Sequence, residues 1–134
     1  MSLNAGIAIE IKVTGAKGGS KAFKEFSDRV FNEIIPRNLR FHGEQATTHM
    51  ENQAPIRTGF LRSTIGYEIT NNLTLSIFAW ARYAGFVEFG TFRMPPRPFF
   101  FPNLNIWIRD RMPEAIRKDM EVLWRQMVSS NKGV

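Results

Sequence analysis

Residues 62–81, "RSTIGYEITNNLTLSIFAWA", determine the architecture more than any other part of this chain. Two segments within them, residues 62–70 and 73–81, are rich in β-branched and other apolar residues, as strands are. Asn71 and Asn72 stand between the two segments. Because asparagine tolerates a positive φ, this pair predicts a tight turn with two central residues. We therefore predict an antiparallel hairpin here.

Two more segments are predicted to be strands. "IAIEIKV", residues 7–13, alternates apolar and polar side chains, which is typical of a half-buried strand. "RYAGFVEFG", residues 82–90, follows the hairpin directly and predicts a third strand of the same meander, with Gly85 at a bulge.

Helical spacing of apolar residues predicts two long helices. The first follows Ser20, a good N-cap, and its periodic pattern continues to about Asn52. Pro36 interrupts this pattern and is expected to end or kink the helix near Ile35. The second helix covers residues 103–128, where Pro113 predicts a kink or a fresh start, and residues 129–134 are expected to form a flexible tail.

This order of elements predicts one α+β domain over residues 1–134. It consists of an N-terminal strand, a long kinked helix, a three-stranded antiparallel meander and a C-terminal helix. The helices are expected to pack on one face of the small sheet.

Composition excludes several classes of function. The chain has 134 residues and no cysteine, so it has no disulfide framework, no thiolate nucleophile and no cysteine zinc site. No apolar run approaches the roughly 18 residues that span a bilayer, so we expect no membrane partner. The net charge is +6, spread mostly as single charges. A basic nucleic-acid-binding module therefore remains the alternative function.

Few residues suggest catalysis or metal binding. His42 and His49 would lie two helical turns apart, roughly 10 Å, too far to share a metal ion, and we expect them on a solvated helix face. Glu88 is predicted to be an outward-facing strand carboxylate or an ion-pair partner. A small hydrolase using Glu88 is a third hypothesis, although no histidine or second carboxylate stands beside it in the sequence. We expect no enzymatic activity, no metal and no cofactor.

Residues 83–104, "YAGFVEFGTFRMPPRPFFFPNL", hold six of the twelve phenylalanines and four of the seven prolines. The prolines predict a stiff, extended arm. Side chains alternate along an extended segment, so Phe99 and Phe101 would face the core and Phe100 away from it, or the reverse. Such a preordered apolar arm suits an interface with another subunit. Phe100→Asp is accordingly expected to leave the monomer folded and to prevent assembly.

Two segments resemble one known family. "APIRTGFLRSTI", residues 54–65, and residues 83–104 are similar to two motifs of tailed-phage neck and tail-completion proteins, the gene-product-ten-like head–tail joining proteins. The resemblance implies a non-enzymatic virion protein at the head–tail interface, which is present in the host cytoplasm during assembly. It also implies a ring, typically a hexamer and monomeric before assembly.

The implied partners are other copies of the chain, a head-completion or stopper protein, the tail tube protein, and DNA that passes through the lumen without specific binding. The motifs and the apolar arm together supply the expected assembly interface: Arg57, Gly59, Leu61, Arg62, Glu88, Phe89, Gly90, Thr91, Phe92, Arg93, Met94, Pro95, Pro98, Phe99, Phe100, Phe101 and Pro102.

Overall fold

The computed structural model describes residues 6–15, 19–55 and 59–132. Its elements in chain order are β1 (Ile7–Lys12), α1 (Lys21–Arg29), the π-helical segment η1 (Val30–Ile34), α2 (Ile35–Gln53), α3 (Phe60–Ser63), β2 (Ile65–Thr70), β3 (Thr74–Ala79), α4 (Ala84–Phe89), α5 (Phe101–Leu104), the π-helical segment η2 (Asn105–Arg111) and α6 (Met112–Lys132). The α+β class predicted from the sequence is confirmed, with the helices on one face of a small antiparallel sheet.

The sheet has three antiparallel strands in the order β1-β3-β2. The predicted hairpin joins β2 to β3, and both central residues of its turn have positive φ, 54° at Asn71 and 61° at Asn72. The Leu73 N–H closes this turn by donating to the Thr70 carbonyl. The third strand is the N-terminal segment, which pairs with β3 from Ile7 opposite Ala79 to Lys12 opposite Thr74.

Residues 84–89 are helical, so the prediction of a third meander strand with a bulge at Gly85 is wrong. The buried residues of α4 are Ala84, Val87 and Glu88, which have the three-to-four spacing of one helix face. A short apolar run is compatible with both the two-residue period of a strand and the 3.6-residue period of a helix, and residues 84–89 follow the helical one.

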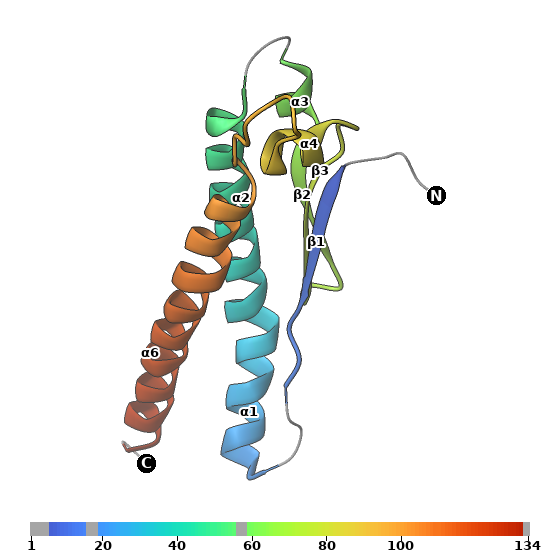
Figure 1. Cartoon of the computed structure of the whole chain (residues 1–134). Coiled ribbons are helices and arrows are strands. Elements are labelled where there is room, and N and C mark those ends of the chain that lie inside the picture. The colour runs from blue at the N-terminus through green and yellow to red at the C-terminus, as the bar shows by residue number, and fades with distance from the viewer. Residues whose placement is uncertain (1–5, 16–18, 56–58, 133–134) are drawn as a thin grey trace.

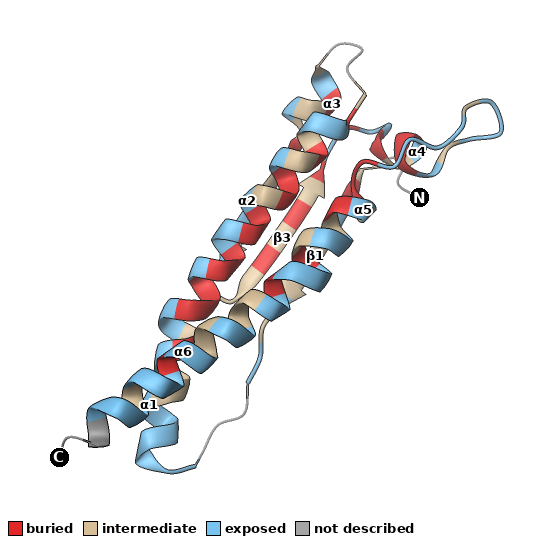
Figure 2. Cartoon of the chain, turned by 90° about the vertical axis from the view of Figure 1, so that its left-hand side faces the viewer, coloured by how far each residue is buried: buried red, intermediate tan, exposed pale blue. Residues whose placement is uncertain are grey.

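The elements α1, η1 and α2 follow one another as one long helix, α6 runs alongside it, and α2 packs on one face of the sheet (Figure 1). Buried residues gather where this helical layer meets the sheet (Figure 2). The inward side chains of β3, Leu75 and Ile77, are fully buried, as are Leu39 and Met50 of α2. Burying each such side chain stabilises the fold by about 1.5–3 kcal/mol.

Both helix-interior prolines follow a π-helical segment. The Ile35 N–H donates to the Val30 carbonyl, five residues back, and Pro36 comes next. The same i to i−5 bond joins Met112 to Trp107 immediately before Pro113. A proline has no N–H and its ring crowds the carbonyl four residues back, and the wider turn relieves this clash. The helices therefore continue through both prolines instead of ending there.

Ser20 caps α1, since its side chain accepts a hydrogen bond from the Phe23 N–H at 3.2 Å. His42 is buried, contrary to expectation, and its Nδ1 donates to the Asn38 carbonyl at 2.9 Å. The helix α6 continues through Lys132, so residues 129–132 are helical where a flexible tail was expected. Within the described part of the chain, no helix is both long and apolar enough to cross a bilayer.

Candidate assembly surface

The carboxylate of Glu88 joins α4 to the start of the C-terminal helix. Its Oε1 accepts hydrogen bonds from the backbone N–H groups of Phe99 and Phe100, at 2.9 and 2.8 Å, and its Oε2 accepts one from Phe101 at 3.0 Å. The first N–H groups of a helix have no partner within the helix, and they favour a negative charge. Glu88, which is 4% exposed, therefore caps the helix that begins at Phe101 and continues through η2 into α6.

Residues 91–98, between α4 and the phenylalanines whose N–H groups Glu88 binds, form a loop. From here on, the arm means these residues alone. A tight turn shapes its tip, because Thr91 and Met94 exchange backbone hydrogen bonds of 2.8 and 3.2 Å. The Thr91 hydroxyl accepts further bonds from the N–H groups of Arg93 and Met94. At the base of the arm, the Arg97 N–H donates to the Val87 carbonyl at 2.8 Å. These bonds fix the arm's conformation before any partner binds.

Gly90 gives the chain the conformation that the arm needs. Its φ of 77° and ψ of 174° belong to a backbone region that only glycine adopts readily. A Cβ at this position would lie 2.7 Å from the Pro96 nitrogen and 2.9 Å from the Met94 carbonyl oxygen. Position 90 therefore requires glycine both for its backbone conformation and because the two sides of the arm leave no room for a Cβ.

Large apolar side chains are exposed at this end of the molecule. Phe92, at the tip of the arm, is 94% exposed, and the Arg93 guanidinium lies 5.3 Å from the centre of its ring. The exposed arm extends beyond the packed elements near α4 (Figure 2). Further exposed aromatic residues, on α3, on α4 and at its start, are Phe60, Tyr83, Phe86 and Phe89. We call this surface, together with the arm, the arm end.

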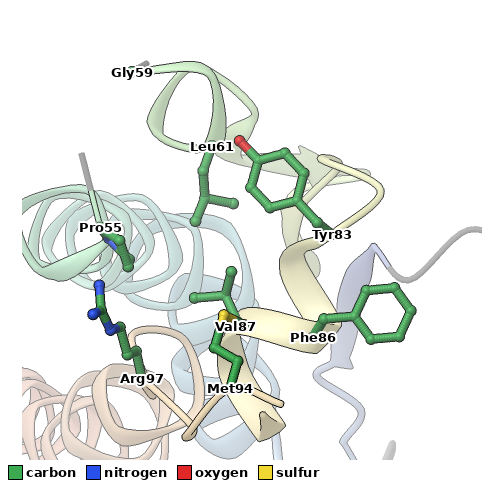
Figure 3. Close-up of a pocket in the computed structure, with 8 residues that line it drawn as sticks. All are labelled: Pro55, Gly59, Leu61, Tyr83, Phe86, Val87, Met94 and Arg97. Carbon is green, nitrogen blue, oxygen red and sulfur yellow. The ribbon is translucent and has the colours of Figure 1, made fainter. Parts of the chain in front are cut away.

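A pocket of about 530 Å³ opens at the arm end. Its lining residues come from the end of α2, α3, α4 and the arm: Pro55, Gly59, Leu61, Tyr83, Phe86, Val87, Met94 and Arg97. Leu61 and Val87 point toward one another across it, while the Phe86 ring points away (Figure 3). The lining is mostly apolar, with the Tyr83 hydroxyl and the Arg97 guanidinium as its polar groups, and none of the described residues that line it is acidic.

The charges of the arm end differ from those of the helical layer. Every ion pair among the described residues lies on α1, η1, α2 or α6, as with Arg29 and Glu33 at 3.3 Å or Arg37 and Asp119 at 3.1 Å. Four arginines at or near the arm end are in no ion pair with a described residue: Arg62, Arg82, Arg93 and Arg97. The Nε of Arg62 is buried without a hydrogen-bond partner. The arm end therefore presents apolar surface with unneutralised positive charge.

The structure corrects the predicted orientation of the three consecutive phenylalanines. Phe99 and Phe100 are both fully buried, with ring centres 6.2 Å apart, and Phe101 is half-buried. Neither predicted alternation holds, because a helix begins at Phe101 and the Glu88 carboxylate draws three successive N–H groups toward itself. Phe100 belongs to the core of its own subunit, so we now expect Phe100→Asp to unfold the monomer instead of leaving it folded.

Glu88 is likewise misplaced in the sequence-based prediction, since it faces inward from a helix. Its carboxylate is occupied by three backbone bonds, which gives it a structural role and argues against its use in hydrolysis.

The other predicted interface residues fall into four groups. Leu61 is buried and Met94 is half-buried in the pocket lining. Arg57 lies outside the described residues. The exposed members are Phe89, Thr91, Phe92, Arg93, Pro95, Pro98 and Pro102, while Gly59, Arg62 and Gly90 are half-buried.

Sequence reasoning missed four residues of this surface: Phe60, Tyr83, Phe86 and Arg97. The spacing of three between Tyr83, Phe86 and Phe89 is a helical signal that the strand interpretation of residues 82–90 concealed. The buried Asn103 was missed too, and its side chain donates to the Phe99 carbonyl at 2.8 Å and to the Gln53 side chain at 2.9 Å.

Comparison with known proteins identifies a family whose model matches the chain. A family model described as "Bacteriophage HK97-gp10, putative tail-component" matches residues 20–90, just over half of the chain. The match includes α1 to α4, with Glu88 and Gly90, and ends before the arm and before the helix start that Glu88 caps. No curated protein and no solved structure matches the chain. The chain belongs to the HK97-gp10-like family of bacteriophage tail components.

Proposed function

We propose that the chain forms a ring that joins the head connector to the tail tube, and that the arm end makes contacts within this assembly. Membership of a tail-component family gives the chain a structural role in the virion. The finer role, tail completion between a head-completion or stopper protein and the tail tube protein, is our proposal. In it the ring is a hexamer assembled from monomers in the host cytoplasm, DNA passes through its lumen, and the chain has no enzymatic activity.

The observation that carries the proposal is the exposure of Phe92 on a conformationally fixed arm. An apolar ring that is 94% exposed gains its full burial free energy only on contact with another molecule. Because the arm is already ordered, docking it costs little conformational entropy. Aromatic residues, Met and Arg are also the residue types enriched at the centres of protein interfaces, and they dominate the arm end.

The test uses heads and tails made without this protein, counted by electron microscopy after the purified chain is added. Particles without the chain are expected to be intact and unjoined, and the wild-type chain is expected to join them. Phe92→Asp is expected to remain folded and to fail in joining. Phe41→Asp, which alters a half-exposed phenylalanine on α2, is the matched control and is expected to join particles normally. If Phe92→Asp joined heads to tails normally, the proposed role of the arm in assembly contacts would be wrong.

A nucleic-acid-binding module remains the second candidate, because the unpaired arginines of the arm end could also contact phosphates. That function predicts DNA affinity that falls steeply as the salt concentration rises. Undetectable DNA binding at about 50 mM salt would rule it out.

A further inference from the structure

No helix of the described chain covers the face of the sheet opposite α2 (Figure 1). The outward residues of β3 are Thr74, Ser76 and Phe78, Trp80 follows directly after the strand, and the helices α1, α2 and α6 all lie on the other side (Figure 1). Phe78 and Trp80 stack with ring centres 5.1 Å apart and an interplanar angle of 18°. Trp80 is 52% exposed. The face thus presents a flat aromatic surface to its surroundings.

Gly66 makes room for this aromatic surface. It pairs with Phe78 across the sheet, and a Cβ built on it would lie 3.0 Å from the Phe78 ring. The ring therefore lies over the backbone of β2. Ala8 is opposite Phe78 on the other side, so the neighbouring side chains are small and leave the aromatic pair accessible.

Next to the aromatic pair lies a row of acidic residues. Glu10 on β1 and Glu68 on β2 both pair in register with Ser76, one on each side of it. Both glutamates are exposed, and neither forms an ion pair with a described residue. Lys12, two residues along β1, is the one basic residue of this face among the described strands. The row is therefore negative beside an aromatic patch.

The arm has the complementary combination. Phe92 is almost completely exposed and Arg93, also exposed, has no carboxylate partner among the described residues. Successive outward residues on a strand, such as Phe78 and Ser76, are about 7 Å apart, a distance that two adjacent side chains on a turn can bridge. An aromatic and a cation on one surface therefore match aromatics and two carboxylates on the other.

We propose that the arm of one subunit lies on the open sheet face of the next subunit, with Phe92 against Phe78 and Trp80 and with Arg93 at Glu10 and Glu68. The occupant of the sheet face is a second copy of this chain, and the proposal rests on the ring proposed above. The contact joins two different surfaces of the chain, so it is heterologous, and repeated heterologous contacts generate a closed ring when the rotation per subunit closes.

The pocket at the arm end is the less favourable site for a neighbouring arm. Met94 and Arg97, which belong to the arm itself, line it. A second arm would bring Arg93 close to Arg97 in a pocket without an acidic residue, and like charges at an interface oppose association. The open sheet face offers two carboxylates to the same arginine.

The experiment reverses the charges one surface at a time. Arg93→Glu changes the arm, the pair Glu10→Arg with Glu68→Arg changes the sheet face, and a third protein carries all three substitutions. The readouts are the mass of the assemblies in solution and the fraction of joined particles. Matched controls are Arg109→Glu on η2 and Glu44→Arg on α2, both exposed and outside every ion pair of the described residues. Circular dichroism verifies that each variant is folded.

Each surface variant is expected to lower the ring population at least about tenfold relative to wild type, because like charges then face each other. The three substitutions together are expected to restore it, and both controls are expected to assemble normally. Rings formed equally well by wild type and by both surface variants would overturn this contact while leaving the ring itself intact. Defective folded variants without restoration in the combined protein would overturn the pairing of these residues. A wild-type chain that never contacts its own copies, alone or in joined particles, would overturn the ring and the contact together.

Discussion

The Glu88 carboxylate accepts a hydrogen bond of 2.8 Å from the Phe100 backbone N–H, and this bond unites the two parts of the aromatic, proline-rich segment. Glu88 belongs to α4 and Phe100 immediately precedes α5, with the arm between them. The arm is thus a closed loop whose two ends are held by one buried side chain. Phe92 at its tip is exposed, whereas Phe99 and Phe100, which follow the arm, are core residues.

Glu88→Gln is expected to lower the free energy of unfolding by about 1–3 kcal/mol. The amide retains one acceptor oxygen, but it places an NH₂ group where Oε2 accepts from Phe101 and it removes the negative charge at the helix start. Denaturant unfolding followed by circular dichroism measures the change. Glu44→Gln, on the exposed side of α2, is the control and is expected to have little effect. Equal stability of Glu88→Gln and wild type would contradict the capping role.

Phe100→Ala and Phe92→Ala separate the core from the exposed tip of the arm. Phe100 is fully buried, so its truncation is expected to cost about 3–5 kcal/mol of stability. Phe92 is 94% exposed, and its truncation is expected to change the monomer's stability by less than about 0.5 kcal/mol. Thermal and denaturant unfolding of the two variants test this contrast. Similar losses in both would mean that the arm packs on its own domain.

Gly90→Ala is expected to destabilise the protein more than Gly59→Ala does. Both glycines have positive φ, but Gly59 lies in the left-handed region, where a side chain costs about 1–2 kcal/mol. Gly90, with ψ at 174°, lies in a region that only glycine adopts readily, so the backbone cost there is larger. Of these two sites, only Gly90 would bring the new Cβ against backbone, at 2.7 Å from the Pro96 nitrogen, whereas at Gly59 no atom of the described residues lies within 4 Å. Parallel measurements of the unfolding free energy give the difference. Hydrogen exchange at the Thr91 amide should additionally accelerate in Gly90→Ala, and unchanged exchange there would argue against a rigid arm.

Asp119 makes stability depend on pH. Burial raises the pKa of its carboxyl, but hydrogen bonds from Asn38 and Arg37 outweigh this, so that the pKa lies below the usual 3.8. A carboxyl whose pKa is lowered by folding stabilises the native state above its unfolded-state pKa, and the contribution disappears as the pH falls through the folded-state value. The difference in unfolding free energy between wild type and Asp119→Asn should therefore be largest above about pH 5 and shrink in acid. Asp110→Asn controls for the loss of one exposed charge, and a pH-independent difference would exclude the linkage.

Local chemistry made the hairpin and the helix start predictable. Asn71 and Asn72 adopt the positive φ that their residue type permits, and Ser20 caps α1 as its hydroxyl predicts. The family resemblance, too, lay in contiguous motifs of residues 54–65 and 83–104, and the family match agrees with it.

The burial of Glu88 and of the phenylalanines could not be predicted from the sequence, because it depends on contacts between residues that are not neighbours in the chain. Glu88 satisfies backbone groups eleven to thirteen residues further along the chain, so no local pattern indicates that it is buried. The same bonds turn Phe99 and Phe100 inward together and defeat the alternation expected of an extended segment. At Pro36, proline chemistry was interpreted correctly as a disturbance, but the packing of both flanking segments keeps the helix continuous through a π-helical turn.

The strand order β1-β3-β2 also has a kinetic consequence. The hairpin of β2 and β3 closes through a short local turn, whereas β1 must find β3 across α1, η1 and α2, with Lys12 opposite Thr74. Contacts between residues so distant in sequence form slowly because a long loop must close first. We therefore expect β1 to dock last during folding. Since β1 carries Glu10, the acidic row of the open face is complete only in the fully folded chain. If this face is the docking surface proposed above, partly folded copies are expected to be excluded from the proposed ring.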